Sequence, residues 1–223
     1  MKKIRVAIDG PAGAGKSSVS RLTAEKLGYS YIDTGAIYRA LALFMGDASA
    51  EDHDKIRELL KDFDVSFKIE KGVNRVFLNG NDVTNEIRAE KISMKASSVS
   101  AIPFVREALF NMQRKYAETG GVVMEGRDIG TVIMPDAELK IFLTASPEKR
   151  AKRRMLEIEA KGGKVDFGEL VKEIKERDIK DSTRAVSPLK QAEDAVLLDN
   201  SDINLDETVG IIVKYAKERE KLN

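Results

Sequence analysis

The sequence contains no cysteine and only one histidine, His53, among its 223 residues. Without cysteine, disulfide bridges, thiolate metal sites and a cysteine nucleophile are excluded. His53 lies among acidic residues at the expected start of a helix, where we predict an exposed side chain in the first turn. Catalysis by a serine–histidine pair or a histidine-bound metal is therefore disfavoured, and the chemistry is expected to use lysine, arginine, aspartate and a bound cation.

Net charge and long apolar runs are lacking as well. The 38 basic residues balance 37 acidic residues to a formal charge of +1, so no overall field attracts nucleic acid or an anionic membrane. No apolar run approaches the ~18–20 residues that a membrane span needs, and the first residues carry no signal-peptide pattern. We expect a cytoplasmic, monomeric protein that binds small molecules and neither nucleic acid nor membrane.

The most informative segment present is residues 10–17, which match the complete phosphate-binding pattern G-x-x-x-x-G-K-[ST] between a strand-like run and a helical pattern. Its glycines allow backbone amides to close around phosphate oxygens, and the helix N-terminus adds partial positive charge. Lys16 can reach the β- and γ-phosphates, and the Ser17 hydroxyl can bind Mg²⁺. The residues assigned to nucleotide binding here are Gly10, Pro11, Ala12, Gly13, Ala14, Gly15, Lys16, Ser17 and Ser18.

Short apolar runs alternate with helical patterns along the chain. The runs that predict buried strands are 4–8, 29–32, 121–124, 139–144 and 195–198. Helical spacing of apolar residues marks 16–27, 56–63, 105–116 and 209–216. Strands that alternate with helices indicate an α/β fold with a parallel sheet covered by helices.

Two segments depart from this alternation. In residues 64–84, Val65, Phe67 and Ile69 alternate with polar residues around turns at Lys71-Gly72 and Asn79-Gly80, which predicts a small antiparallel hairpin insert. Residues 148–181 are rich in charge and poor in apolar residues, with a glycine pair at 162–163. That composition predicts two helices with little core of their own, forming a mobile lid.

The length suits one domain with an insert or two rather than two independent domains. We predict a single domain over 1–223, with its core in 1–35, 100–147 and 185–223, a monophosphate-binding insert in 36–99 and a lid in 148–184. The N-K-x-D motif typical of GTPases does not occur, and a motor ATPase would be larger. A small-metabolite phosphotransferase is the favoured class.

Polar motifs follow the second and third predicted strands, at the edge of the sheet where ligands bind. In 33–39, a glycine, a hydroxyl and an arginine suit an incoming phosphate. Arg127 and Asp128 form either a structural ion pair or a ligand clamp, and residue patterns do not favour one over the other.

Two further groups of charges lie in or beside the predicted lid. Arg177, Asp181 and Arg184 fall at i, i+4 and i+7, where a solvated ladder of ion pairs is the commoner arrangement. The basic run 149–154 has acidic neighbours and no interleaved aromatic residues, so arginines that close on ATP are favoured over a nucleic-acid patch.

Taken together, the motifs resemble those of the bacterial cytidylate kinase family of P-loop nucleoside monophosphate kinases. They are the phosphate loop, D-T-G-A-I-Y-R, S-S-V-S…P-F-V-R, G-R-D-I-G-T, R-R-M and E-R-D…D-S-T-R-A. Their order and spacing hold over essentially the whole chain. The resemblance implies a P-loop NTPase core with five parallel strands, a mobile monophosphate-binding region, a mobile lid, and transfer of phosphate from ATP, with Mg²⁺, to CMP and dCMP.

The resemblance also implies roles for individual residues. The acceptor phosphate would be held by Thr34, Arg39, Arg127 and Arg184, and cytosine would be read by Ser97, Arg106 and Asp128. The ribose would meet Arg177 and Asp181, while Arg150, Arg153 and Arg154 would belong to the lid without a fixed choice of which one contacts ATP. The residues expected to act in catalysis are Lys16, Arg39, Arg127 and Arg184.

Three other functions remain open on sequence alone. A kinase for another monophosphate, or for a small metabolite such as shikimate, would share the core and differ in the acceptor contacts. A regulatory nucleotide switch would hydrolyse slowly and show no acceptor-dependent ADP release. A nucleic-acid-binding protein would depend on the basic run, which the near-zero net charge disfavours.

Overall fold

The computed structural model of the chain describes residues 2–70, 73–118, 120–160 and 162–222. The chain divides into two compact units, one formed by Met1–Tyr31 with Ala117–Asn223 and the other by Ile32–Tyr116. Each unit has a hydrophobic core of its own.

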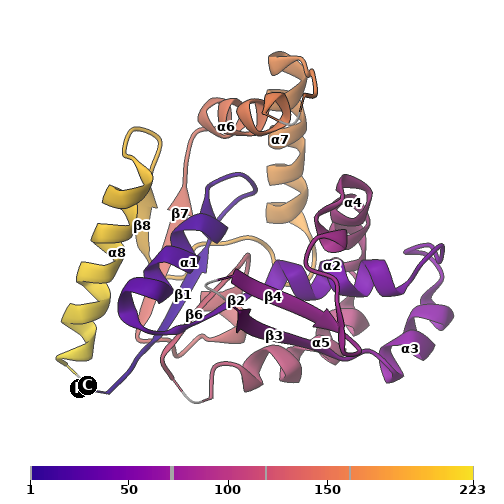
Figure 1. Ribbon diagram of the computed structural model, residues 1–223, viewed down its shortest axis with the longest axis horizontal. Helices are drawn as coiled ribbons and strands as arrows, with labels where there is room; N and C mark the ends of the chain where they lie inside the picture. Colours follow the sequence, from indigo (N-terminus) through magenta and orange to yellow (C-terminus); the bar gives the residue numbers. More distant parts are fainter. Residues whose placement is uncertain (1, 71–72, 119, 161, 223) are drawn as a thin grey trace. The chain divides into compact units, whose positions relative to one another are not determined.

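A five-stranded sheet organises the first unit (Figure 1), with its edge strand β2 running across the boundary. Its strands are β1 (Arg5–Asp9), β2 (Ser30–Asp33), β6 (Val122–Gly126), β7 (Leu139–Thr144) and β8 (Val196–Asp199), in the order β2-β6-β1-β7-β8. β1 pairs in parallel with β6 and β7, and β7 with β8. The central strands are buried along almost their whole length, as expected of a parallel sheet flanked by helices. The predicted α/β fold is confirmed.

Helices α1 (Lys16–Leu27) and α8 (Leu205–Glu220) pack against each other and against this sheet. The apolar side chains Val19, Val209 and Ile212 are fully buried and join Ile8 and Ile141 of the sheet in one core. Asn204 begins α8 with a capping box, in which its side chain and that of Glu207 each accept a backbone N–H.

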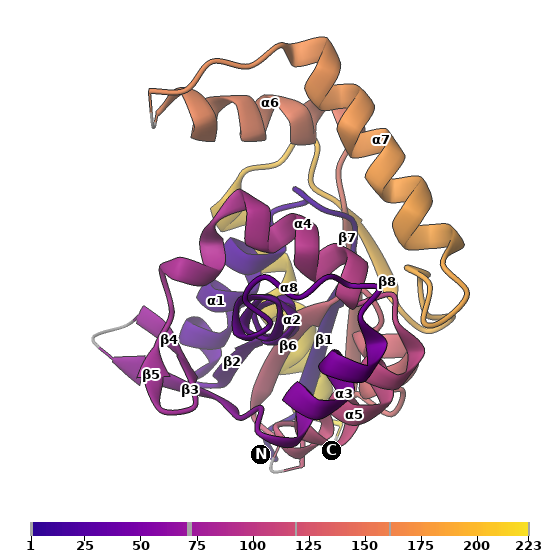
Figure 2. The ribbon, with the colours of Figure 1, turned by 90° about the vertical axis from the view of Figure 1, so that its right-hand side faces the viewer.

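Two helices stand beyond the carboxyl edge of the sheet (Figures 1 and 2). α6 (Pro147–Glu159) follows β7, and α7 (Phe167–Thr183) packs against α6. The predicted pair of helices around the glycines at 162–163 is thereby confirmed, with Gly162 at a positive φ of 80°. After β6, the chain forms a short π-helical turn, η2 (Ile129–Ile133).

The second unit combines helices with a small antiparallel sheet. Its helices are α2 (Thr34–Phe44), α3 (His53–Lys61), η1 (Glu86–Arg88), α4 (Glu90–Val99) and α5 (Pro103–Lys115), and its strands are β3 (Val65–Glu70), β4 (Val73–Leu78) and β5 (Asn81–Asp82). The predicted hairpin is confirmed and gains β5, joined to β4 by Asn79 and Gly80, both at positive φ. The predicted turn at Lys71-Gly72 lies outside the described residues.

The sequence patterns locate the strands of the five-stranded sheet to within two residues. The helix at 16–27 and the strand at 139–144 have the predicted bounds. His53 begins α3 and is exposed, as predicted. The helical spacing through Phe63 overshoots, since α3 ends at Lys61 and Phe63 reaches the core from an irregular segment. None of the described helices is long and apolar enough to cross a membrane.

Candidate active site

The phosphate-binding loop connects β1 to α1, in the context that its sequence motif requires. Gly10, Gly13 and Gly15 all have positive φ values, of 152°, 75° and 86°. At Gly10, a Cβ atom would lie 1.9 Å from the carbonyl oxygen of Leu143, so only glycine fits there. Gly15, the N-cap of α1, provides no side-chain cap, so the first-turn amides of this helix can donate to an anion.

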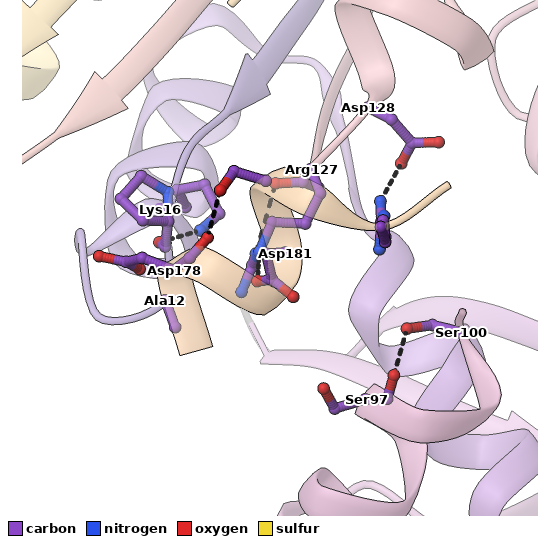
Figure 3. Close-up of polar contacts among 12 residues, drawn as sticks. Ala12, Lys16, Ser97, Ser100, Arg127, Asp128, Asp178 and Asp181 are labelled. Carbon is purple, nitrogen blue, oxygen red and sulfur yellow. Dashed lines mark hydrogen bonds and ion pairs between the residues drawn. The ribbon is translucent and has the colours of Figure 1, made fainter. Parts of the chain in front are cut away.

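Lys16 opens α1 and is buried, with 6% of the residue exposed. Its Nζ donates a hydrogen bond to the carbonyl oxygen of Pro11 at 2.7 Å (Figure 3). Burial first, and then the positive charge of Arg127, lower the pKa of Lys16 from 10.5 to about 7, against the opposing effect of Glu125. A positive charge on Lys16 is thus costly without a ligand, and a bound phosphate would offset that cost.

The Ser17 side chain is exposed on the first turn of α1, beside Lys16. Among the described residues, no three carboxylate or imidazole side chains come together as a metal site. A lone hydroxyl beside a phosphate site suits Mg²⁺, which keeps most of its water and is shared with substrate phosphates. The donor set therefore fits Mg²⁺ bound together with a nucleotide and does not form an all-protein cage.

The charged residues after β6 pair with the C-terminal end of α7. Arg127 Nε donates to Asp181 Oδ2 at 3.0 Å (Figure 3), and Arg184 Nη2 lies 3.9 Å from Asp128 Oδ1. Arg184 also donates from Nε to the carbonyl oxygen of Ser187 at 2.6 Å. Two oppositely charged pairs thus join segments more than 50 residues apart, with the Asp128 and Arg184 side chains at most 10% exposed.

The sequence predicts a ladder of ion pairs along one helical face, and for Arg184 this prediction is wrong. α7 ends at Thr183, and Arg184 is its C-cap with an extended ψ of 143°. Asp181 instead contacts Arg127. Arg177 is exposed on the same helix, and its charge contributes to the lowered pKa of Lys16.

The three lid arginines differ in what they contact. The Arg150 side chain is 3% exposed. It binds Asp178 of α7 with two hydrogen bonds, at 2.9 and 2.5 Å, and donates to the carbonyl oxygen of Ala12.

Arg153 donates to the carbonyl oxygens of Ala14 and Asn200. Arg154 pairs on the surface with Glu157. Arg150 and Arg153 therefore contact the phosphate loop, whereas Arg154 pairs along its own helix.

In the second unit, the segment after β2 carries its arginine in a fixed position. Asp33 caps α2 by accepting the amide N–H of Ala36 at 3.1 Å, and its other oxygen accepts from Arg39 Nη2 at 2.7 Å. A Cβ at Gly35 would lie 3.0 Å from both Arg39 and Asp33, so the glycine permits this approach. Thr34 is buried at the start of α2.

Ser97 and Arg106 of the second unit meet through Ser100. Arg106 Nη1 donates to the carbonyl oxygen of Ser100 at 2.9 Å. The Ser100 hydroxyl donates to the backbone carbonyl oxygen of Ser97 at 3.0 Å (Figure 3). The Arg106 guanidinium lies over the Tyr38 ring, 5.5 Å from its centre. Arg106 is only 8% exposed, so backbone and aromatic contacts hold its orientation.

The sequence-assigned residues therefore fall into two groups, one in each unit. The structure also reveals functional candidates that motif reading missed: Asp9, Asp33, Tyr38, Glu125 and Asp178. Asp9 and Glu125 are buried acids at the ends of apolar strands, which is the signal that could have identified them. Burial raises the pKa of Asp9 to about 6, and Glu125 accepts a hydrogen bond from the Tyr31 hydroxyl.

Comparison with known proteins gives a consistent result. A family model described as cytidylate kinase matches residues 6–218. A cytidylate kinase of Caldicellulosiruptor saccharolyticus is 52% identical over 211 residues, covering 94% of this chain and 93% of that one. One from Streptococcus gordonii is 50% identical over 222 residues, 98% of each chain. Among solved structures, an uncharacterized protein from Eubacterium ventriosum has a TM-score of 0.53 at 16% identity, over 96% of this chain and 99% of that one, a likeness in fold alone.

Proposed function

The chain belongs to the cytidylate kinase family and is a nucleoside monophosphate kinase, and we propose that it transfers the γ-phosphoryl group of MgATP to CMP, and to dCMP, giving CDP or dCDP. The family match along nearly the whole chain carries this proposal. A complete phosphate loop and a set of arginines and acids suited to a pyrimidine monophosphate agree with it.

For ATP, we propose that the loop 10–18 holds the phosphates through its backbone amides and the N-terminus of α1. Lys16 turns from Pro11 to the β- and γ-phosphates, where its charge offsets the charge of the transferring group. The Ser17 hydroxyl would hold Mg²⁺, which would supply further positive charge at the phosphate oxygens. Arg150 and Arg153, which already contact the loop carbonyls, are the lid arginines closest to the donor site, and Arg154 takes part only after the lid moves.

For the acceptor, we propose that Thr34, Arg39, Arg127 and Arg184 bind the monophosphate. Arg39 is oriented by Asp33, and Arg127 by Asp181. The second pKa of a phosphate monoester is near ~6, so the attacking oxygen is already ionised at neutral pH and no general base is required. What the site must overcome is repulsion between two anions that approach in line, which its arginines and Lys16 offset.

Base recognition is assigned to Ser97, Arg106 and Asp128. Cytosine presents acceptors at O2 and N3 and a donor at its 4-amino group. Arginine only donates and an ionised aspartate only accepts, so Arg106 suits O2 and N3 while Asp128 suits the amino group, with the Ser97 hydroxyl as a second acceptor. Uracil instead has a hydrogen-bond donor at N3 and an acceptor at position 4, so neither group would match Arg106 and Asp128. The ribose hydroxyls are assigned to Arg177 and Asp181.

The same proposal gives roles to whole segments. Residues 36–99 bind the monophosphate and 148–184 close as a lid over a single domain of 1–223. The small number of buried residues in the two lid helices supports a mobile lid. They are Arg150 and Ala151 in α6 and Leu170 and Asp181 in α7. We further propose that the protein acts as a cytoplasmic monomer on small-molecule substrates, without nucleic acid.

Ligand-induced thermal stabilisation tests the choice of acceptor. At about 100 times its dissociation constant, CMP should add about 2.7 kcal/mol to the unfolding free energy, a rise of several degrees in Tm. Arg106→Met should abolish most of this rise, whereas Arg114→Met, near the other end of α5, should keep it. A larger shift with AMP, UMP or shikimate than with CMP would overturn the proposal.

A further inference from the structure

Both carboxylate oxygens of Asp9 bind backbone amides of a distant turn. Asp9 ends β1 and is 5% exposed. Its Oδ1 accepts from the amide N–H of Ile129 at 2.8 Å, and its Oδ2 accepts from that of Gly130 at 2.7 Å. These two amides open the π-helical turn η2, immediately after Asp128. Strand pairing places Asp9 opposite Gly126, so the contact joins the carboxyl ends of two neighbouring strands.

Amides at the start of a helical turn are usually satisfied by the side chain of the N-cap residue, and aspartate is among the residues most favoured there. The N-cap of η2 is Asp128, yet its side chain accepts no hydrogen bond from this turn. Asp9 occupies the cap from another strand. The Asp128 carboxylate is turned instead toward Arg184.

We propose that Asp9 is a positioning residue for base recognition: by capping η2 in place of Asp128, it keeps the Asp128 carboxylate directed at the acceptor base. This inference rests on the proposed function, in which Asp128 accepts from the cytosine amino group. Without Asp9, Asp128 would satisfy the two amides of its own turn and turn away from the ligand.

The packing around η2 allows little room for another arrangement. A Cβ at Gly130 would lie 3.4 Å from Asp9 Oδ2 and 3.2 Å from Lys140 Cδ, so glycine admits both side chains. Lys140 is held in turn by the carbonyl oxygen of Pro135 and by Asp194. Burying the Asp9 carboxylate raises its pKa to about 6, while the two amides act in the opposite direction. These two hydrogen bonds therefore compensate a costly buried group.

The test measures kcat/KM for CMP and for UMP in the parent enzyme, in Asp9→Asn, in Asp128→Ala and in the double variant. Asparagine keeps the shape of Asp9 but offers one acceptor where two are needed. In Asp9→Asn, we expect the ratio of kcat/KM for CMP to that for UMP to fall about 10-fold, as for the loss of a hydrogen bond to a charged group. KM for ATP should stay within about twofold of the parent value. In the Asp128→Ala background, Asp9→Asn should leave the ratio unchanged, because its effect acts through Asp128.

A matched control is Glu138→Gln. Glu138 also accepts a backbone amide, that of Arg5 at 2.8 Å, but at the other end of β1, and its substitution should leave the ratio as in the parent. If Asp9→Asn does not fold, Asp9→Ser, which retains a single oxygen, takes its place.

Three results would overturn the inference: an unchanged ratio in the Asp9 variant, a further fall in the ratio when Asp9 is changed in the Asp128→Ala background, or an equal fall in the Glu138 control. If the parent does not prefer CMP to UMP, the proposed function fails, and the inference with it. If the parent prefers CMP and the Asp9 variant keeps that preference, only the inference fails.

Discussion

The Nζ of Lys16 lies 2.7 Å from the carbonyl oxygen of Pro11, inside the loop that binds nucleotide phosphates in this fold. The lysine therefore bonds its own loop, and burial and the charge of Arg127 lower its pKa there. Under the proposed function, phosphate oxygens would replace the carbonyl as the partner of Lys16 and would favour its charged form. The predictions for the donor site follow from this change of partner.

Replacement of Lys16 should reduce turnover far more than it affects the fold. In Lys16→Met we expect kcat to fall at least about 10²-fold, since the lost charge acts mainly on the transition state. Steady-state kinetics and circular dichroism measure the two effects. Lys26→Met, at the exposed end of the same helix, should behave like the parent. Near-parent turnover in a folded Lys16→Met enzyme would exclude the phosphate-loop mechanism.

Binding of MgATP should be coupled to proton uptake. With its pKa lowered to about 7, Lys16 is mostly neutral at about pH 8 in the free enzyme, and the bound phosphates raise its pKa again. Calorimetric titrations at about pH 8, in buffers of different ionisation enthalpy, should report uptake of up to about one proton. Lys16→Met should take up none from this site, and equal uptake in parent and variant would assign the proton elsewhere.

The same pKa predicts how Lys16 affects stability. Its folded pKa lies below its unfolded value of 10.5, so the unfolded chain binds this proton more tightly. The stability that this group contributes is therefore fully present above pH 10.5, and it is lost as the pH falls from there through about 7. Lys16→Met should remove this part of the pH dependence, measured by urea unfolding between those limits. An unchanged pH profile in the variant would contradict the assigned shift.

Replacement of Asp128 should change which base is accepted. If Asp128 accepts from the cytosine amino group, Asp128→Ala should lower kcat/KM for CMP. The expected loss of transition-state stabilisation is on the order of 1–3 kcal/mol. The value of kcat/KM for UMP should fall much less. The ratio of the two constants measures the effect. Asp136→Ala, an exposed acid a few residues further along, should keep the parent ratio. Equal losses for both substrates would mean that Asp128 supports the site without reading the base.

Hydrogen exchange should distinguish a lid from a static pair of helices. Amides of α6 and α7 should exchange rapidly in the free protein and slow markedly when an ATP analogue and CMP are both bound. Amides in the middle of α8, whose inner face is part of the sheet core, provide the internal control and should change little. Equal protection of α6 and α7 in both states would rule out closure.

Local features of the chain could be predicted well. The bounds of α1 follow from the phosphate-loop motif before it and a glycine at its end, and β7 is a continuous apolar run. The sequence pattern does not identify α2, a mostly apolar helix in which seven of 11 residues are buried. β5 has only two residues, too few for any alternating pattern.

The partners of the charged residues could not be predicted. Arg127 and Asp128 are neighbours in sequence, yet the structure pairs them with Asp181 and Arg184, more than 50 residues further along the chain. The cap that Asp9 provides for η2 is likewise a contact between residues 120 positions apart. Residue patterns identify which side chains carry charge, and the tertiary structure decides which of them meet.

The central claim is tested most directly by acceptor-dependent ADP release, measured in a coupled assay with ATP and Mg²⁺ held fixed. The panel contains CMP, dCMP, UMP, AMP and shikimate, with a reaction lacking any acceptor as the baseline. The account predicts rapid ADP release with CMP and dCMP, much slower release with UMP, and release near the baseline with AMP, shikimate or no acceptor. Faster release with any other acceptor than with CMP, or a rate that no acceptor increases, would contradict it.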